Sequence, residues 1–413
     1  MSLVLDRPIQ IRPRVVRPLQ RPEDSRVGLW HAPAVIAENH FVYKSLSNWA
    51  LNVAVGCSHA CRFCYVPSAA TIKQGPKLAE YGVKDPDAEW GDYVLLRPWD
   101  EKKFLASLRA AETTLRKQLK PDGNRAVIYC STTDPYQVIR HPDPARQREL
   151  AGHARFLVRR SLELIRDQST LNVRILTRSP LARADFDLFK SFGKRLVFGM
   201  SLPTLRNDLA RVYEPKAPAP SQRLATLHAA KEAGLHVYVA LAPTYPECDE
   251  ADLRATLQAV AELEPITIFH EPINIRAENV ARIEQHAEAL GLVPLRKFAQ
   301  SDTLSRPADT LSPALSGREG RGEGVLRFMR RAGVRSRILR TDVFATRESW
   351  QDYAVTALHT VSEIAKELGI EKHLHLWPDK SLGSQSLADR MPNPHKYLKR
   401  LEHWWHRVGE WPK

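Results

Sequence analysis

From about residue 49 onward, short apolar runs alternate with longer stretches in which apolar residues recur at helical spacing. The apolar runs are bounded by turn residues, and they predict buried strands at 49–56, 126–133, 172–177, 196–202, 236–242 and 266–269. The amphipathic stretches predict helices at 102–119, 145–166, 184–192, 221–233, 250–263 and 277–290. Several end at a residue type that suits the end of a helix: Gly193, Gly234 and Gly291.

Six strand-then-helix units in sequence predict an α/β fold whose parallel sheet curls into a barrel or partial barrel. A doubly wound open sheet is the alternative architecture for the same order of elements. No G-x-G-x-x-G motif follows any of the predicted strands, which weighs against a dinucleotide-binding fold.

The pattern changes on both sides of this α/β domain, which we place at 46–299. Residues 1–45 are rich in Pro and Arg and weakly patterned, so we expect an extended arm. Residues 300–324 combine Ser, Gly, Pro, Arg and Glu without periodicity, which predicts a disordered low-complexity insertion in a surface loop. A C-terminal α-rich extension over 325–413 follows, with predicted helices at 325–332, 349–368 and 396–411 and one further strand at 373–377.

The composition is ordinary for a soluble globular protein, with 43% hydrophobic and 26% charged residues. No apolar run approaches the roughly 18–20 residues that a membrane helix needs. The first residues, MSLVLDRPIQIRPRVVRP, contain an early Asp and repeated Pro, so they resemble neither a signal peptide nor a transit helix. We therefore expect a cytoplasmic protein without a membrane partner.

The formal net charge of +14 is consistent with a nucleic-acid partner, because basic side chains release counterions from phosphates. The alternative is an Arg-rich, solvated surface without such a partner. No dense basic block occurs in the sequence, so the charge by itself does not decide between the two.

Three of the five cysteines fall within eight residues, in the segment NVAVGCSHACRFCY at 52–65. Such clustering in a cytosolic chain is typical of metal binding or redox chemistry. Cys57, Cys61 and Cys64 are spaced C-x3-C-x2-C directly after the first predicted strand. Three thiolates leave one iron of a four-iron cluster without a protein ligand, and that iron can chelate the amino and carboxylate groups of S-adenosylmethionine.

A zinc site is the alternative, with His59 or a distant residue as the fourth ligand. Zinc sites usually contain two Cys pairs, or a Cys pair with a His pair, and this sequence has no second pair. The position of the cysteines after the first strand of a repeated β/α pattern further favours the iron–sulfur interpretation.

The segment GCSHACRFCY resembles the radical S-adenosylmethionine (radical SAM) superfamily, and specifically its spore photoproduct lyase-like branch. Members of that branch tend to carry G-C-x-H-x-C-x-Y-C-Y, a strand ending near T-D-x-Y, then T-K-S and E-P-x-A-P-x-x-x-R. The matching stretches here are STTDPYQ at 131–137, TRS at 177–179 and EPKAPAPSQR at 214–223. The resemblance covers roughly residues 46–290. Two positions depart from it, since Arg178 replaces the Lys of T-K-S and Phe63 replaces the Tyr before the last cysteine.

The resemblance implies a partial (β/α)6 TIM-type barrel that binds a [4Fe-4S] cluster and S-adenosylmethionine at the carboxyl ends of its strands. It also implies an enzyme that receives an electron from a reductant such as ferredoxin or flavodoxin and abstracts a hydrogen atom from its substrate. Lyase-type repair of nucleic acid is the family analogy, although a fold does not determine a function. The alternative from another class is a nucleic-acid-binding protein with a structural zinc or iron–sulfur centre.

By the same resemblance, polar residues at the end of the second predicted strand would bind the methionyl amine, namely Ser131, Thr132, Thr133 and Asp134. The same residue types also form helix caps and turns. Arg178 would pair with the methionyl carboxylate, as the family's Lys does.

Other positions would complete the cofactor pocket. Ser201 ends the fourth predicted strand, where similar enzymes contact the ribose. Phe63 would keep an apolar wall near the adenine, and Tyr65 would line the pocket or pack as an ordinary aromatic. Glu214 and Arg223 would form an ion pair that braces the loop after the fourth strand.

Two further cysteines are candidate hydrogen-atom donors, because the photoproduct-repairing relatives use a Cys in this way. They are Cys130 and Cys248, and the alternative for each is a small buried apolar residue. The segment FHEPIN closes the sixth predicted strand, where barrel enzymes display functional groups. His270, Glu271 and Asn274 of this segment would contact substrate or pack behind the site.

Overall fold

The computed structural model describes residues 26–39, 47–120, 124–276, 278–294 and 338–377, together with residues 379 and 382. The predicted insertion at 300–324 and the predicted helices at 325–332 and 396–411 lie outside these residues. In the described ranges, no helix is both long enough and apolar enough to cross a membrane.

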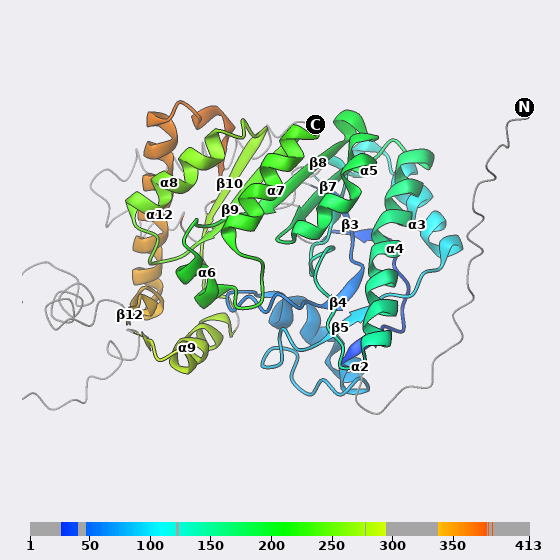
Figure 1. The fold of residues 1–413 in the computed structure, drawn as a ribbon, viewed down its shortest axis with the longest axis horizontal. Coiled ribbons are helices and arrows are strands. Elements are labelled where there is room, and N and C mark those ends of the chain that lie inside the picture. Colours follow the sequence, from blue (N-terminus) through cyan, green and yellow to red (C-terminus); the bar gives the residue numbers. More distant parts are fainter. Residues whose placement is uncertain are drawn as a thin grey trace, which may run out of the picture.

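An eight-stranded sheet runs through the molecule in the order β13-β10-β9-β8-β7-β6-β3-β2 (Figure 1). Neighbouring strands are parallel except for β2 and β3. Among the described residues the two edge strands do not pair with each other, which agrees with the predicted partial TIM-type barrel. The strands are β2 Ile36–Glu38, β3 Ser47–Leu51, β6 Asn124–Tyr129, β7 Asn172–Thr177, β8 Leu196–Ser201, β9 Val237–Thr244, β10 Thr267–Pro272 and β13 Leu374–Leu376.

Helices follow the parallel strands and pack against the sheet, for example α7 on β8 and β9, and α12 on β10. Figure 1 shows α3 and α4 near β3 and, on the opposite side of the molecule, α8 and α12 near β10. Asp100, Asp143 and Asp249 cap α3, α4 and α8 by accepting hydrogen bonds from the first turn. The helices are α2 Gly75–Ala79, α3 Glu101–Thr113, α4 Pro144–Gln168, α5 Phe186–Lys190, α6 Asn207–Tyr213, α7 Pro220–Glu232, α8 Glu250–Ala261, α9 Asn279–Ala289 and α12 Arg347–Glu367.

The first predicted strand, 49–56, was wrong as a single element. It is two strands in different sheets: β3 belongs to the large sheet, and β4 (Ala54–Gly56) belongs to a three-stranded sheet with β1 (Val27–Leu29) and β5 (Val94–Leu96). The chain leaves the large sheet at Asn52, whose side chain bonds Ser131 and Thr132 after β6. An apolar run predicts only that its residues are buried. Because β3 and β4 are both buried, the run does not show that they belong to different sheets.

Other boundaries differ by a few residues. The helix predicted at 102–119 ends at Thr113, and Leu115 beyond it is exposed. The strand predicted at 373–377 is β13, which extends the large sheet by pairing with β10 in parallel. The segment 1–45, predicted as an extended arm, contains β1 and β2 in its described part. Two short strands, β11 (Val293–Pro294) and β12 (Ile338–Leu339), pair in parallel.

Three buried clusters matter for the site. The largest fills the space between the sheet and its helices. A second lies under the loop that follows β4 and includes Trp30, Trp90 and Tyr93. A third consists of Tyr238, Phe269 and Trp377, which come from β9, β10 and the end of β13.

Candidate active site

Residues 57–65, here called the cysteine loop, connect β4 to the next helical turn. Cys57 and Cys61 are buried and Cys64 is half-buried, and none of the three forms a disulfide. Burial raises the pKa of all three thiols, that of Cys61 to about 12. Binding of iron must therefore displace thiol protons.

Two glycines allow the backbone to pass close to the cysteine loop. Gly56, with φ of +88°, immediately precedes Cys57, and a Cβ there would lie 2.2 Å from the Tyr93 carbonyl oxygen. Gly91, with φ of +105°, lies against the loop, and a Cβ there would lie 2.2 Å from the Cβ of Ala60. An L side chain at either position would meet both a steric clash and backbone strain.

Segments distant in sequence hold the loop in place. The backbone N–H of Arg62 donates to the carbonyl oxygen of Tyr213 at the end of α6, at 2.9 Å. From α9, the guanidinium of Arg282 donates to the carbonyl oxygens of Arg62 and Cys64. The loop is therefore held between the segment before β5, the end of α6 and α9.

The donor set fits an iron–sulfur cluster. Beside the three thiols, the loop contains three buried polar atoms without a hydrogen-bond partner in the protein: Ser58 Oγ, His59 Nε2 and Arg62 Nε. Buried polar atoms are normally hydrogen-bonded, and the sulfur atoms of a cluster accept hydrogen bonds. Among the described residues, no three His, Cys, Asp or Glu side chains gather as closely as a single metal ion requires. In a four-iron cluster, by contrast, each thiolate binds a different iron.

Asp134 joins three parts of the site. Its Oδ1 accepts a hydrogen bond from the hydroxyl of Thr177 at 2.7 Å, and its Oδ2 accepts one from the backbone N–H of Arg178 at 2.8 Å. The same carboxylate lies 3.5 Å from Nδ1 of His59 in the cysteine loop. Asp134 therefore ties the segment after β6 to the end of β7 and to the cysteines.

Thr133 has a similar connecting position. Its hydroxyl donates to the carbonyl oxygen of Gly56 at 2.6 Å and accepts from the side chain of Gln137 at 2.7 Å. Ser131, two residues earlier, accepts from Asn52 and also lines a cavity described below. Of the four residues predicted to bind the methionyl amine, Ser131 alone lines this cavity.

The predicted ion pair between Glu214 and Arg223 is present, and Arg178 extends it. Nε of Arg178 donates to Oε1 of Glu214 at 2.6 Å, while Arg223 contacts the other carboxylate oxygen. Burial by itself raises the pKa of Glu214, but the two guanidiniums outweigh burial and lower this pKa to about 2. Glu214 thus stays ionised inside the protein.

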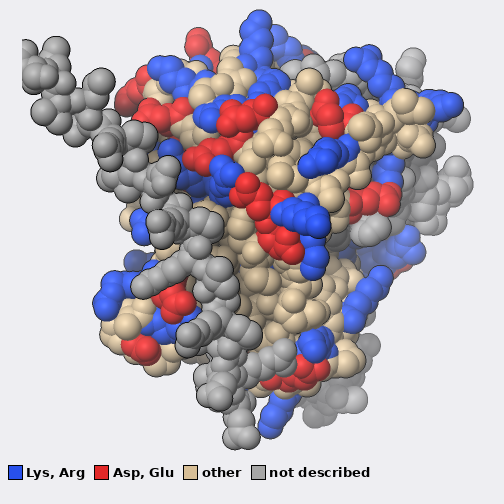
Figure 2. Space-filling model, turned by 90° about the vertical axis from the view of Figure 1, so that its right-hand side faces the viewer, with Lys and Arg blue, Asp and Glu red and all other residues tan. Residues whose placement is uncertain are grey.

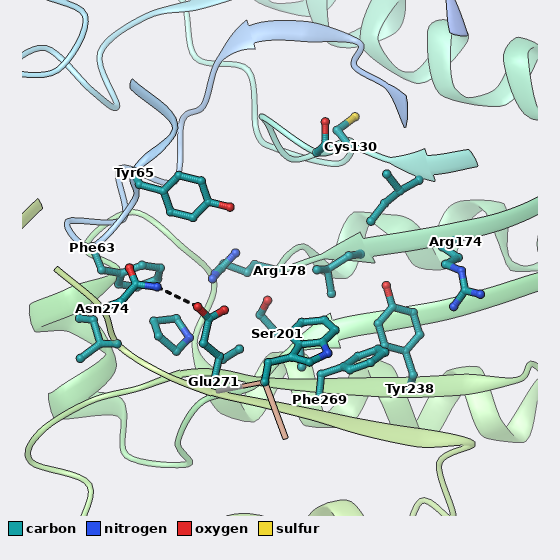
Figure 3. Close-up of a pocket in the computed structure, with 18 residues that line it drawn as sticks. Phe63, Tyr65, Cys130, Arg174, Arg178, Ser201, Tyr238, Phe269, Glu271 and Asn274 are labelled. Carbon is teal, nitrogen blue, oxygen red and sulfur yellow. Dashed lines mark hydrogen bonds between the residues drawn. The ribbon is translucent and has the colours of Figure 1, made fainter. Parts of the chain in front are cut away.

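A cavity of about 230 Å³ opens beside the cysteine loop, inside the curved sheet (Figure 3). Predicted site residues from the cysteine loop and from the ends of β6, β7 and β8 meet there: Phe63, Tyr65, Cys130, Ser131, Arg178 and Ser201. Carboxyl ends of neighbouring parallel strands meet at one edge of a sheet, which explains why residues so far apart in sequence gather. The third buried cluster, of Tyr238, Phe269 and Trp377, also lines the cavity.

Figure 3 shows how polar groups are distributed around the cavity. Arg178 lies between Tyr65 on one side and Glu271 on the other. Asn274 donates a hydrogen bond to Glu271 at 2.8 Å, and both residues line the cavity. Cys130 lies on the same side of the cavity as Tyr65.

The structure separates the two candidate hydrogen-atom donors. Cys130 lines the cavity, whereas Cys248 follows β9, where its thiol contacts Asp252. Burial raises the pKa of both thiols. The structure also separates His270 from Glu271 and Asn274, since His270 is fully buried behind the cavity and shares a 2.7 Å hydrogen bond with Thr244.

Several residues that position the site were not identified from the sequence. Tyr245 is one, since its ring stacks on Tyr213 at 4.0 Å and lies 5.9 Å from Phe63. Its position at the end of β9 is the signal that could have identified it. No local signal marks Arg282, which is 218 residues from Cys64 in sequence.

With this geometry in view, comparison with known proteins identifies the family. The sequence profile of the radical SAM superfamily matches residues 51–260, just over half of the 413-residue chain. The chain belongs to the radical SAM superfamily. This membership confirms the predicted cofactors, a [4Fe-4S] cluster and S-adenosylmethionine, and makes the protein a radical SAM enzyme. It favours the enzyme over the alternative of a binding protein with a structural metal centre.

Individual similar proteins were also found. An uncharacterized protein of Acidianus two-tailed virus is 31% identical over 255 residues, which cover 60% of this chain and 74% of the viral protein. An uncharacterized protein of Methanocaldococcus jannaschii is 25% identical over 234 residues, which cover 56% of this chain and 72% of that protein. Among solved structures, spore photoproduct lyase complexed with dinucleoside spore photoproduct aligns with a TM-score of 0.45 and 16% identity. That alignment covers 63% of this chain and 65% of the lyase, slightly less than two thirds of its length.

Proposed function

We propose that this radical SAM enzyme holds its cluster through Cys57, Cys61 and Cys64 and abstracts a hydrogen atom from a substrate that reaches the cavity. The observation that carries the proposal is that one cavity borders the cysteine loop at Phe63 and Tyr65 and is lined by polar residues at the strand ends. When bound, the cluster would supply the electron for reductive cleavage of S-adenosylmethionine. A reductant such as ferredoxin or flavodoxin would provide that electron.

The chain's own residues would bind and orient the cofactor. Arg178, held at Nε by Glu214, would face the methionyl carboxylate, and Ser131 and Ser201 would contact the amine and the ribose. Phe63 and Tyr65 would form the wall of the adenine pocket, where they exclude water. The protein contacts of Thr133 and Asp134 support an indirect part for these two residues in cofactor binding.

Cys130 is the hydrogen-atom donor that we propose. It lines the cavity, and the burial that raises its pKa keeps the S–H bond intact at neutral pH. Donation requires this bond, because the hydrogen atom passes to a substrate radical and leaves a sulfur-centred radical. Cys248 is not among the residues that line the cavity, which supports a role for it as a buried packing residue.

We expect that Cys57→Ala, Cys61→Ala and Cys64→Ala each remove most bound iron and all cleavage of S-adenosylmethionine. Three thiolates are the minimum for an open-iron site, so none of the ligands is spare. Iron content and deoxyadenosine formation are measured after anaerobic purification. Cys130→Ala is the matched control for losing a thiol, and it should keep its iron. Full activity in any of the three ligand variants would overturn the assignment.

We also propose that the substrate is nucleic acid, the target of a lyase-type reaction in the family analogy. The net charge of +14 supports this proposal. Lys and Arg are interspersed with Asp and Glu on the face shown in Figure 2, so the attraction should be weak. Fluorescence anisotropy with a labelled duplex and a labelled single strand should show affinity falling linearly, on logarithmic axes, with salt. No binding at roughly 50 mM salt, where screening is small, would remove nucleic acid as the substrate.

The cytoplasmic location expected from the sequence stays a prediction.

A further inference from the structure

A buried chain of two ion pairs lies beside the cysteine loop. Glu214 is fully buried and sits between Arg178 and Arg223, whose side chains are 18% and 1% exposed. Arg223 also donates to the carbonyl oxygens of Pro218 and Ser201. Two guanidiniums against one carboxylate leave this group with a net positive charge.

The chain of ion pairs is tied to the cysteine loop at two points, through Arg178 and through the residue before Glu214. On one side, the guanidinium of Arg178 lies 5.6 Å from the ring centre of Phe63, the residue before Cys64. On the other side, Glu214 directly follows Tyr213, whose carbonyl oxygen accepts the hydrogen bond from Arg62 of the loop. The surplus charge is therefore held at a constant position relative to the cysteines.

Arg178 is the cation of this group that lies against the loop. Its guanidinium faces the ring of Phe63, whereas Arg223 contacts Glu214 and the carbonyl oxygens of Pro218 and Ser201. Glu214 and Arg223 link α6 to α7 and β8 without Arg178. Arg178 adds a second cation to a carboxylate that is already paired.

A fixed positive charge in a poorly solvated place stabilises nearby negative charge. One-electron reduction makes a [4Fe-4S] cluster more negative by one charge, and neighbouring charges and hydrogen bonds set its reduction potential. The electron comes from the external reductant, and no bond in the protein forms or breaks. A cation beside the cysteine loop would therefore favour the reduced form of the cluster.

We propose that the Arg178–Glu214–Arg223 chain holds the charge of Arg178 beside the cysteine loop and thereby raises the reduction potential of the cluster. Arg178 is in this respect a positioning residue that acts through electrostatics, in addition to any contact with S-adenosylmethionine. The inference rests on the proposal that Cys57, Cys61 and Cys64 hold the cluster.

The test is the midpoint potential of the cluster, titrated anaerobically with EPR detection in the absence of S-adenosylmethionine. Arg178→Met should shift the potential to more negative values, and Arg178→Lys should stay near the wild type. Glu214→Gln, which removes a negative charge, should shift it to more positive values. Because general disruption of the site would move both charge-removing variants the same way, opposite shifts identify the electrostatic effect.

Arg183→Met is the control, because Arg183, like Arg178, follows β7 but is exposed and donates a hydrogen bond to Thr226 on α7. The midpoint potential of the cluster should not change in Arg183→Met. If Glu214→Gln fails to fold, the comparison of Arg178→Met with Arg178→Lys still decides. An unchanged potential in Arg178→Met, or shifts of the same sign in Arg178→Met and Glu214→Gln, would overturn the inference. A wild-type protein without iron would instead overturn the proposed function.

Discussion

At the scale of single residues, Gly91 decides how closely the segment before β5 approaches the cysteine loop. Its backbone has a φ of +105°, and the nearest atom to a Cβ at this position would be the Cβ of Ala60, at 2.2 Å. Ala60 itself has a positive φ of 55° and lies between Cys57 and Cys61. The glycine and the strained alanine therefore fit together as one tight contact.

We predict that Gly91→Ala destabilises the protein by at least about 1–3 kcal/mol, because both strain and overlap oppose the substitution. The expected signs are a lower Tm and less iron per chain. Gly152→Ala is the control, since Gly152 lies in α4 and a Cβ there would meet nothing within 4 Å. That control should raise stability by about 0.5–1 kcal/mol through helix propensity. Equal Tm changes in the two variants would contradict the close-contact interpretation.

At the scale of elements, Glu214 connects three of them. The carboxylate follows α6, and its partners are Arg178 after β7 and Arg223 in α7. Asp134 makes a comparable connection between the segment after β6, the end of β7 and the cysteine loop. Buried carboxylates that bond several elements fix the relative positions of strand ends more than apolar packing does, because their contacts are directional.

We predict that Glu214 makes the protein acid-sensitive. Its pKa is lowered from 4.5 to about 2 on folding, so the unfolded chain binds the proton more tightly. The stability that Glu214 contributes is therefore fully present above about pH 4.5 and is lost as the pH falls toward 2. Glu214→Gln should be less stable than the wild type at pH 7, and the difference should narrow below about pH 4.5.

Denaturant unfolding of the iron-free wild type and variant between pH 7 and pH 3 measures this difference. An exposed carboxylate variant, Glu264→Gln, is the control and should keep a constant difference over the same range. A gap between Glu214→Gln and the wild type that stays constant down to pH 3 would show that Glu214 does not titrate in this way.

At the scale of the whole molecule, the large sheet is completed by a strand from far along the chain. β13 pairs with β10, and Trp377 just after it packs on Phe269 at 4.1 Å inside the curved sheet. The pairing of β11 with β12 brings residues 293–294 next to residues 338–339. The C-terminal part therefore contributes to the cavity wall as well as to the sheet.

We predict that deletion of residues 303–323 leaves cluster content and S-adenosylmethionine cleavage nearly unchanged. The composition of this segment does not support a packed core, and the cost of closing a loop changes slowly with its length. Iron per chain, deoxyadenosine formation and Tm of the shortened protein are compared with those of the full chain. An unfolded or iron-free product would show that the segment is an integrated part of the structure.

The sequence by itself determined the features that depend on local patterns. The spacing of Cys57, Cys61 and Cys64 indicated the cofactors, and the alternation of apolar runs and amphipathic stretches predicted the parallel α/β fold. Strand β7 was predicted with its observed bounds, because turn residues flank a short apolar run. The charge complementarity of Glu214 and Arg223, nine residues apart, was also visible in the chain.

Only the tertiary structure decided which of the candidate residues meet. Cys130 lines the cavity, whereas Cys248 lies outside its lining and contacts Asp252. Asp134 accepts a hydrogen bond from the backbone N–H of Arg178. The tertiary structure also divided the first predicted strand between two sheets, and it placed Arg282 against the cysteine loop from 218 residues away. These outcomes depend on contacts between strand ends and loops that are distant in sequence, and such contacts leave no periodic or local signal in the chain.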